Sequence, residues 1–157
     1  MTHLNCHEIS LGDTIGVATP ASTIAMLEAA QAVVGSSSSS SGSSTRTKLA
    51  VHFHDTYGQA LANILVSLER GIDTIDSSVA GLGGCPYARG ASGNVATEDV
   101  LYMLQGLGVE TGIDLDKIVD AAKFITGVLG RPSRSRAGLA ISAKRQRNSN
   151  HDKAAVT

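Results

Sequence analysis

The sequence predicts an α/β fold built on a parallel sheet. Three strand-like apolar runs alternate with stretches whose apolar residues recur at helical spacing. Polar residues suited to chemistry follow each strand, where parallel α/β folds build their sites. A complete (β/α)8 barrel needs about 250 residues, whereas the chain has 157. We therefore expect a partial TIM barrel, namely about its last three βα units and a C-terminal helix.

The first unit is predicted from a strand over about 4–11 and a helix that begins after Thr19. Asp13 lies in the loop between them, and Pro20 follows Thr19 at the first helical position, where its missing N–H does no harm. Helical spacing then joins the apolar residues Ile24, Leu27, Ala30 and Val34.

The second unit combines the strand Leu49–His54 with a helix near 58–70, which Gly71 ends as a good C′ residue. The third combines a strand over 73–79, a glycine-rich loop and a helix near 97–107. A last amphipathic helix follows, with Asp114 as its N-cap and six apolar residues on one face: Leu115, Ile118, Val119, Ala122, Ile125 and Leu129.

Two segments stand outside this pattern. Residues 35–48 form a low-complexity insert between a helix and a strand, with eight serines in Gly35–Ser44. Residues 131–157 are polar and lack apolar periodicity, so we expect a disordered tail after a domain over 1–130. The domain has 6 basic and 13 acidic residues, and the tail has 7 basic and 1 acidic.

Composition excludes several classes of protein. A hydrophobic content of 42% and a net charge of −1 are globular values, and no aromatic residues interleave the basic tail, so no nucleic-acid partner is expected. No apolar run approaches the roughly 18 residues of a membrane span. Two separate cysteines suit a reducing compartment, and no targeting segment is visible at Met1–Asn5.

Cys85 stands in the most informative stretch, Ser78-Val79-Ala80-Gly81-Leu82-Gly83-Gly84-Cys85-Pro86-Tyr87. Glycines let the backbone approach a ligand closely, and a cysteine on such a loop can move a proton, whereas a buried cysteine is inert. For the other cysteine, Cys6, a small apolar core position is sufficient.

His52 and His54 are two residues apart on a strand, so they point to one face while Leu49, Val51 and Phe53 point to the other. Taken alone, the histidines suit metal ligation and a hydrogen-bonded interior pair equally well. Asp55 and Thr56 add polar groups directly after the strand, and Asn94 ends a second glycine-containing loop, Gly90–Asn94. Such a mixed set of nitrogen and oxygen donors is compatible with Mg²⁺ or Mn²⁺.

Three strand-end motifs together resemble the hydroxymethylglutaryl-CoA lyase family. They are Glu8–Gly16, Val51–Asn63, and Asp76–Asn94 continuing into Ala96–Asp99. The resemblance covers about residues 6–129, leaving out the serine-rich insert and the tail. Related isopropylmalate and homocitrate synthases share the His-x-His strand but lack the loop that carries Cys85, so the synthase reading fails.

The resemblance implies cleavage of 3-hydroxy-3-methylglutaryl-CoA, a small-molecule CoA thioester, to acetyl-CoA and acetoacetate. It implies that His52, His54 and Asn94 bind a divalent cation, Mg²⁺ or Mn²⁺. It further implies His52 and Asp13 as candidates for moving the hydroxyl proton, and Cys85 as the proton donor to the acetyl-CoA carbanion. Without the family resemblance, Asp13 would be interpreted as a turn or capping residue.

The family's first-strand Arg-Asp motif and a following glutamate have no counterpart in this sequence. We therefore expect a fragment that is inactive alone, and that associates with another copy or with a missing N-terminal half of the barrel. The alternative is a non-catalytic remnant that folds only with a partner chain. No membrane partner is expected, and the family implies a mitochondrial or cytoplasmic location.

Overall fold

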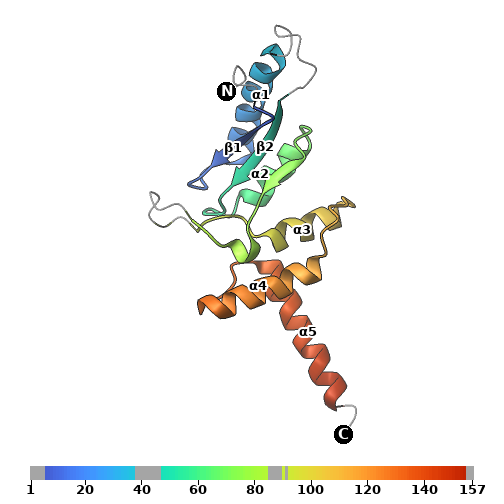
Figure 1. Cartoon of the computed structure of the whole chain (residues 1–157). Coiled ribbons are helices and arrows are strands. Elements are labelled where there is room, and N and C mark those ends of the chain that lie inside the picture. The colour runs from blue at the N-terminus through green and yellow to red at the C-terminus, as the bar shows by residue number, and fades with distance from the viewer. Residues whose placement is uncertain (1–5, 38–46, 85–89, 91, 155–157) are drawn as a thin grey trace. The chain divides into compact units, whose positions relative to one another are not determined.

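The computed structural model describes residues 6–37, 47–84, 90 and 92–154 (Figure 1). The chain divides into two compact units, and each is described by itself. The first comprises residues 1–76 and 84–94, and the second comprises residues 77–83 and 95–157.

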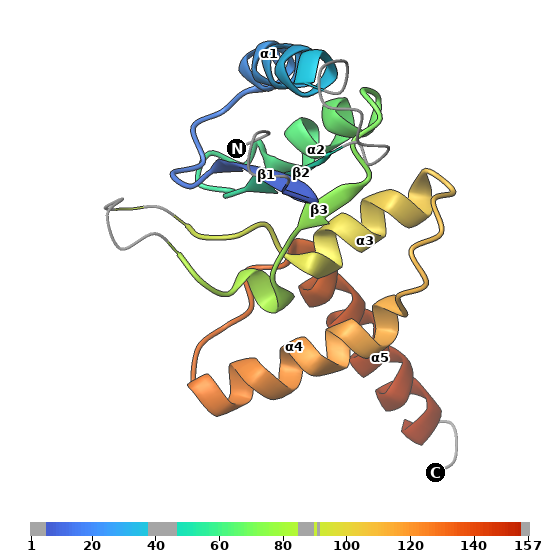
Figure 2. The same cartoon turned by 45° about the horizontal axis from the view of Figure 1, so that its top comes forward.

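The first unit is a three-stranded parallel sheet in the order β1-β2-β3, with two helices on one side of it (Figure 2). Its elements are β1 (Glu8–Asp13), α1 (Pro20–Ser37), β2 (Lys48–Phe53), α2 (Ala60–Leu68) and β3 (Thr74–Asp76). The sheet of parallel strands joined through helices confirms the predicted α/β class.

Strand β2 separates an apolar face from a polar one. Leu49, Val51 and Phe53 are buried on one face, and the other face carries the exposed Lys48, the small buried Ala50 and the partly buried His52. The alternation places the apolar side chains toward α1 and α2, because side chains of successive strand residues point to opposite faces. Ser10, His52 and Asp76 therefore lie on the opposite face of the sheet from α1 and α2.

Strand β1 differs from the expected range of 4–11, because it begins at Glu8 and continues to Asp13. It pairs with β2 residue for residue, from Glu8 opposite Lys48 to Asp13 opposite Phe53. This pairing extends the strand through Asp13, which was expected in a loop. Residues 1–5 lie outside the described part of the chain.

The helices of this unit begin and end close to their predicted positions. Helix α1 begins at Pro20, directly after Thr19, and reaches Ser37, which lies inside the predicted insert. Helix α2 ends before Gly71, whose φ of 76° and N–H bond to the Leu68 carbonyl form the expected glycine C-terminus. Residues 38–46 of the insert lie outside the described residues.

The second unit packs three helices and a short 3₁₀ turn. They are η2 (Val79–Gly81), α3 (Thr97–Gly106), α4 (Leu115–Leu129) and α5 (Arg136–Ala154). Its apolar cluster consists of Leu101, Leu115 and Val119, with Ile118 and Ile141 against it. Asp114 caps α4 as predicted, because its side chain accepts the N–H groups of Asp116 and Lys117.

Helix α5 occupies the segment that was expected to be disordered. Ser135, directly before the helix, and Gly138 and Ser142 within it are buried or partly buried small residues. The packed side therefore has no apolar stripe that would predict a helix, although Ile141 joins the core. The carboxylate of Asp99 accepts the Ser135 hydroxyl at 2.8 Å and the Ala137 N–H at 2.7 Å, which fixes the start of the helix.

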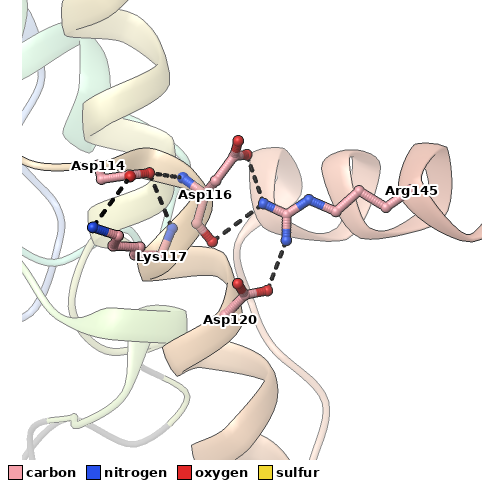
Figure 3. Close-up of polar contacts among 5 residues, drawn as sticks. All are labelled: Asp114, Asp116, Lys117, Asp120 and Arg145. Carbon is pink, nitrogen blue, oxygen red and sulfur yellow. Dashed lines mark hydrogen bonds and ion pairs between the residues drawn. The ribbon is translucent and has the colours of Figure 1, made fainter.

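Arg145 ties α5 to α4 (Figure 3). Its guanidinium lies 2.6 Å from Oδ1 of Asp116 and 2.7 Å from Oδ1 of Asp120, which are one helical turn apart. The tail's positive charge thus meets the acidic face of α4. Among the described residues, no helix has the length and apolar character needed to cross a membrane.

Candidate metal and proton-transfer site

Three chain segments of the first unit meet at the carboxyl end of β2. The backbone N–H of His54 donates to the Asp13 carbonyl at 3.1 Å, which joins the end of β1 to the end of β2. On the other side, His54 forms an isolated antiparallel bridge with Asn94, and the Asp55 N–H donates to the Gly93 carbonyl at 2.9 Å. His54 is therefore the central residue of this convergence.

Asp13 organises the loop that follows β1. Its Oδ1 accepts the N–H groups of Gly16 and Val17 at 3.0 and 3.2 Å, and its Oδ2 accepts the N–H of Ala18 at 2.8 Å. Three donors fill most of the accepting positions of a carboxylate. The side chain thus acts as a turn aspartate within its own loop, whatever further role it has.

Gly16 lets this loop lie tightly against the chain after His54. Its φ is +68°, and a Cβ at this position would lie 2.6 Å from Oγ1 of Thr56 and 2.9 Å from the carbonyl oxygen of His54. Only glycine combines this backbone conformation with such a close approach. The local sequence Asp13-Thr14-Ile15-Gly16 therefore sets the spacing between the two strand-end loops.

The two histidines lie side by side. Their ring centroids are 5.2 Å apart and their planes are inclined by 51°. Burial lowers the pKa of His54, the nearby His52 lowers it further, and Asp13 and a side-chain hydrogen bond with Asn94 partly oppose this. The neutral imidazole that this environment favours is the form that binds metal ions.

The donor set fits a divalent cation. Nδ1 of His54 is buried and has no hydrogen-bond partner among the described residues. This nitrogen is therefore available to bind a ligand. Oδ1 of Asn94 is buried in the same region. Within the described part of the chain, no three His, Cys, Asp or Glu side chains form a metal-binding group. A cation here would depend on the amide oxygen as well as on the two imidazoles.

Cys85, the predicted proton donor, lies outside the described residues. The structure brings together Asp13, His52, His54 and Asn94 from three separate segments. Strand-end position had indicated Asp13, His52 and His54, and the family resemblance had added Asn94 from a second glycine-containing loop.

Two residues of the polar face were missed, Asp76 and Ser10. Oδ2 of Asp76 lies 3.8 Å from Nδ1 of His52 and accepts the Ser10 hydroxyl at 2.8 Å. Asp76 lies in the middle of the expected strand over 73–79, so strand-end position did not mark it, whereas in the structure it is the last residue of β3.

The first unit is a parallel sheet with helices on one face, and imidazole, amide and carboxylate groups lie at the carboxyl ends of its strands. These features define the class of α/β proteins that build a polar site at their strand ends. The comparisons with known proteins are more specific. The family described as HMGL-like matches residues 1–125. The chain belongs to this family.

Relatives and solved structures agree. The chain is 62% identical over 141 residues to the mitochondrial hydroxymethylglutaryl-CoA lyase of Arabidopsis thaliana, covering 90% of the chain and 28% of that protein. It is 52% identical to the cytoplasmic 3-hydroxy-3-methylglutaryl-CoA lyase of Rattus norvegicus, covering 87% of the chain and 37% of that protein.

Crystal structures show the same similarity in three dimensions. The hydroxymethylglutaryl-CoA lyase of Pseudomonas aeruginosa is 55% identical with a TM-score of 0.79, over 90% of this chain and 44% of that one. An HMG-CoA lyase of Acinetobacter baumannii, in complex with coenzyme A and 3-methylmalate, is 35% identical with a TM-score of 0.75, over 88% of this chain and 42% of that one. The chain thus spans less than half the length of these proteins.

Proposed function

We propose that the chain carries the cation-binding and proton-transferring part of an enzyme that cleaves 3-hydroxy-3-methylglutaryl-CoA to acetyl-CoA and acetoacetate. The observation that carries this proposal is the meeting of His52, His54 and Asn94 at the carboxyl end of β2, in a chain of the HMGL-like family. The names of its relatives give the thioester and the lyase class of the reaction, and the family resemblance implies the two products.

The finer architecture belongs to the same proposal. We infer that β1, β2 and β3 are consecutive strands of a (β/α)8 barrel, about its last three units, followed by C-terminal helices. Their parallel sequential order and the helices on one face support this. The polar face with Ser10, His52 and Asp76 would then line the barrel interior, and an N-terminal half or another copy would supply the remaining strands.

His52, His54 and Asn94 would hold Mg²⁺ or Mn²⁺, which polarises substrate oxygens and stabilises developing negative charge when bound. His52 or Asp13 would take the proton of the C3 hydroxyl. The C–C bond then breaks as the acetoacetate carbonyl forms, and the bond's electron pair remains on the acetyl-CoA carbon. Cys85 would donate the proton that converts this carbanion to acetyl-CoA.

Of these two candidates, a His52 imidazole that binds the cation through one nitrogen and carries a proton on the other has no lone pair left for the hydroxyl proton. The Asp13 carboxylate keeps one of its accepting positions. Its two oxygens already accept three backbone N–H groups. We therefore propose that Asp13 takes the proton at its remaining accepting position and that it also fixes the loop beside His54.

The substrate would be a CoA thioester, in keeping with the Acinetobacter complex with coenzyme A. Relatives are named mitochondrial and cytoplasmic, and we propose one of these two locations for the chain.

A hybrid enzyme tests the proposal. Residues 6–130 would replace the matching segment of the Pseudomonas aeruginosa lyase, and acetoacetate release would be measured with Mg²⁺. We expect the hybrid to cleave the thioester, His54→Ala to abolish cleavage, and the isolated chain to be inactive. A folded hybrid without activity would contradict the proposal and favour the non-catalytic remnant.

A further inference from the structure

Ser10, His52 and Asp76 lie on the same face of the sheet, one on each strand, and Ser10 is paired with Ala50, two residues before His52. Asp76 is directly opposite His52 in the pairing of β3 with β2. The single oxygen Oδ2 of Asp76 lies 3.8 Å from Nδ1 of His52 and 2.8 Å from the Ser10 hydroxyl. The Ser10 hydroxyl donates to this carboxylate oxygen and limits the directions in which the Asp76 side chain can turn.

The contact with Asp76 distinguishes the two nitrogens of His52. At 3.8 Å it is an ion-pair contact, longer than a hydrogen bond. A carboxylate beside Nδ1 favours the tautomer with the proton on Nδ1, and this leaves the lone pair on Nε2. Carboxylates that hold one nitrogen of a histidine in this way orient the other toward a metal ion.

Packing does not explain Asp76. Its side chain is 48% exposed, and its pairing with His52 puts it on the face of the sheet opposite α1 and α2. The other nearby carboxylate, Asp13, is occupied by the N–H groups of its own loop. Among the described residues, Asp76 is thus the acidic side chain that is in contact with His52.

We propose that Asp76 is a positioning residue that holds His52, through its Nδ1, in the tautomer and orientation that bind a divalent cation, with Ser10 holding Asp76 in turn. This inference rests on the proposed function of His52. Asp76 itself touches neither substrate nor cation.

The test uses the full chain and Mn²⁺ alone as the probe. Water-proton relaxation would give the Mn²⁺ affinity, and ¹⁵N-detected NMR without metal would give the His52 tautomer, at a pH well above the ordinary imidazole pKa. We expect Asp76→Asn to weaken Mn²⁺ binding roughly tenfold or more and to move the His52 proton toward Nε2. Asp76→Glu should restore part of both effects, and Ser10→Ala should cause a smaller loss.

Asp73→Asn is the matched control, because it removes one negative charge from an exposed aspartate three residues away. It should leave both measurements unchanged. The inference would be overturned if Asp76→Asn left the Mn²⁺ affinity and the His52 tautomer unchanged. It would also be overturned if Asp73→Asn weakened Mn²⁺ binding as much as Asp76→Asn does. If the unaltered chain binds no Mn²⁺, the cation assignment of the proposed function fails. The tautomer measurement then still decides whether Asp76 orients His52.

Discussion

The backbone N–H of His54 donates to the carbonyl oxygen of Asp13 at 3.1 Å, so the residue that ends β1 is bonded directly to the histidine that follows β2. The Asp13 carboxylate meanwhile holds the loop over Gly16–Ala18 through three N–H bonds. One residue thereby fixes both the loop and the position of its neighbour in the site.

Replacing Asp13 should therefore destabilise the loop that follows β1 and, with it, the fold. In Asp13→Ala the three N–H groups lose their acceptor, and we expect the free energy of unfolding to fall by about 1–3 kcal/mol. Urea denaturation followed by circular dichroism measures this change. Glu8→Gln, an exposed change on the same strand, should have no such effect, and an Asp13→Ala chain as stable as the original would contradict the role.

Glu98 predicts a pH dependence of stability in the second unit. Its carboxylate is fully buried and accepts the Ala80 N–H at 3.0 Å on each oxygen, and burial raises its pKa above the ordinary value of 4.5. Between that value and the raised pKa, the folded state binds more protons than the unfolded state. The free energy of unfolding should therefore fall as pH rises through this window.

Glu98→Gln should remove this pH dependence, because the amide keeps an acceptor for Ala80 but does not ionise. Thermal melting at a series of pH values checks the slope. Glu110→Gln is the control, since that side chain is exposed. A pH dependence that persists in Glu98→Gln would show that another group causes it.

Ile141 tests whether α5 is packed in the manner described. Ile141 contacts the Leu101, Leu115 and Val119 cluster, whereas Leu139 on the same helix is 53% exposed. Because Ile141 is only partly buried, we expect Ile141→Ala to destabilise the fold by roughly 1–2 kcal/mol, below the range for fully buried positions. Leu139→Ala should change stability little. Equal effects in urea denaturation would mean that α5 does not pack on this cluster.

Cys85→Ala should greatly reduce turnover in the hybrid enzyme while leaving substrate affinity nearly intact. The thiol is proposed to act on a proton only after C–C cleavage has begun, so its loss affects the transition state more than substrate binding. Steady-state kinetics separates kcat from KM. Deleting residues 38–44 in the same hybrid should change neither, and a Cys85→Ala hybrid with normal kcat would make the cysteine structural.

The sequence was sufficient to predict the parallel α/β class and nearly all the elements, because periodicity and caps act locally. Asp114, for example, accepts N–H groups at the start of α4, and Gly71 adopts the positive φ that follows the end of α2. The position of strand ends likewise predicted that Asp13, His52 and His54 share one site. Asn94 came from the family resemblance.

What the sequence did not reveal depends on contacts between distant residues. Helix α5 starts on Asp99, which is 36 residues before Ser135, and packs through small side chains that give no hydrophobic pattern. Asp76 became a candidate only when strand register placed it opposite His52. Strand pairing, unlike a helix cap, is not encoded in neighbouring residues.

Mn²⁺ titration of the whole chain tests the central claim most directly, namely that His52, His54 and Asn94 bind a divalent cation. Two imidazoles and one amide oxygen are few ligands, so we expect weak but saturable binding. His54→Ala should abolish it, whereas His7→Ala, at an exposed histidine outside the site, should leave it unchanged. Binding that survives in His54→Ala at the original affinity would contradict the account.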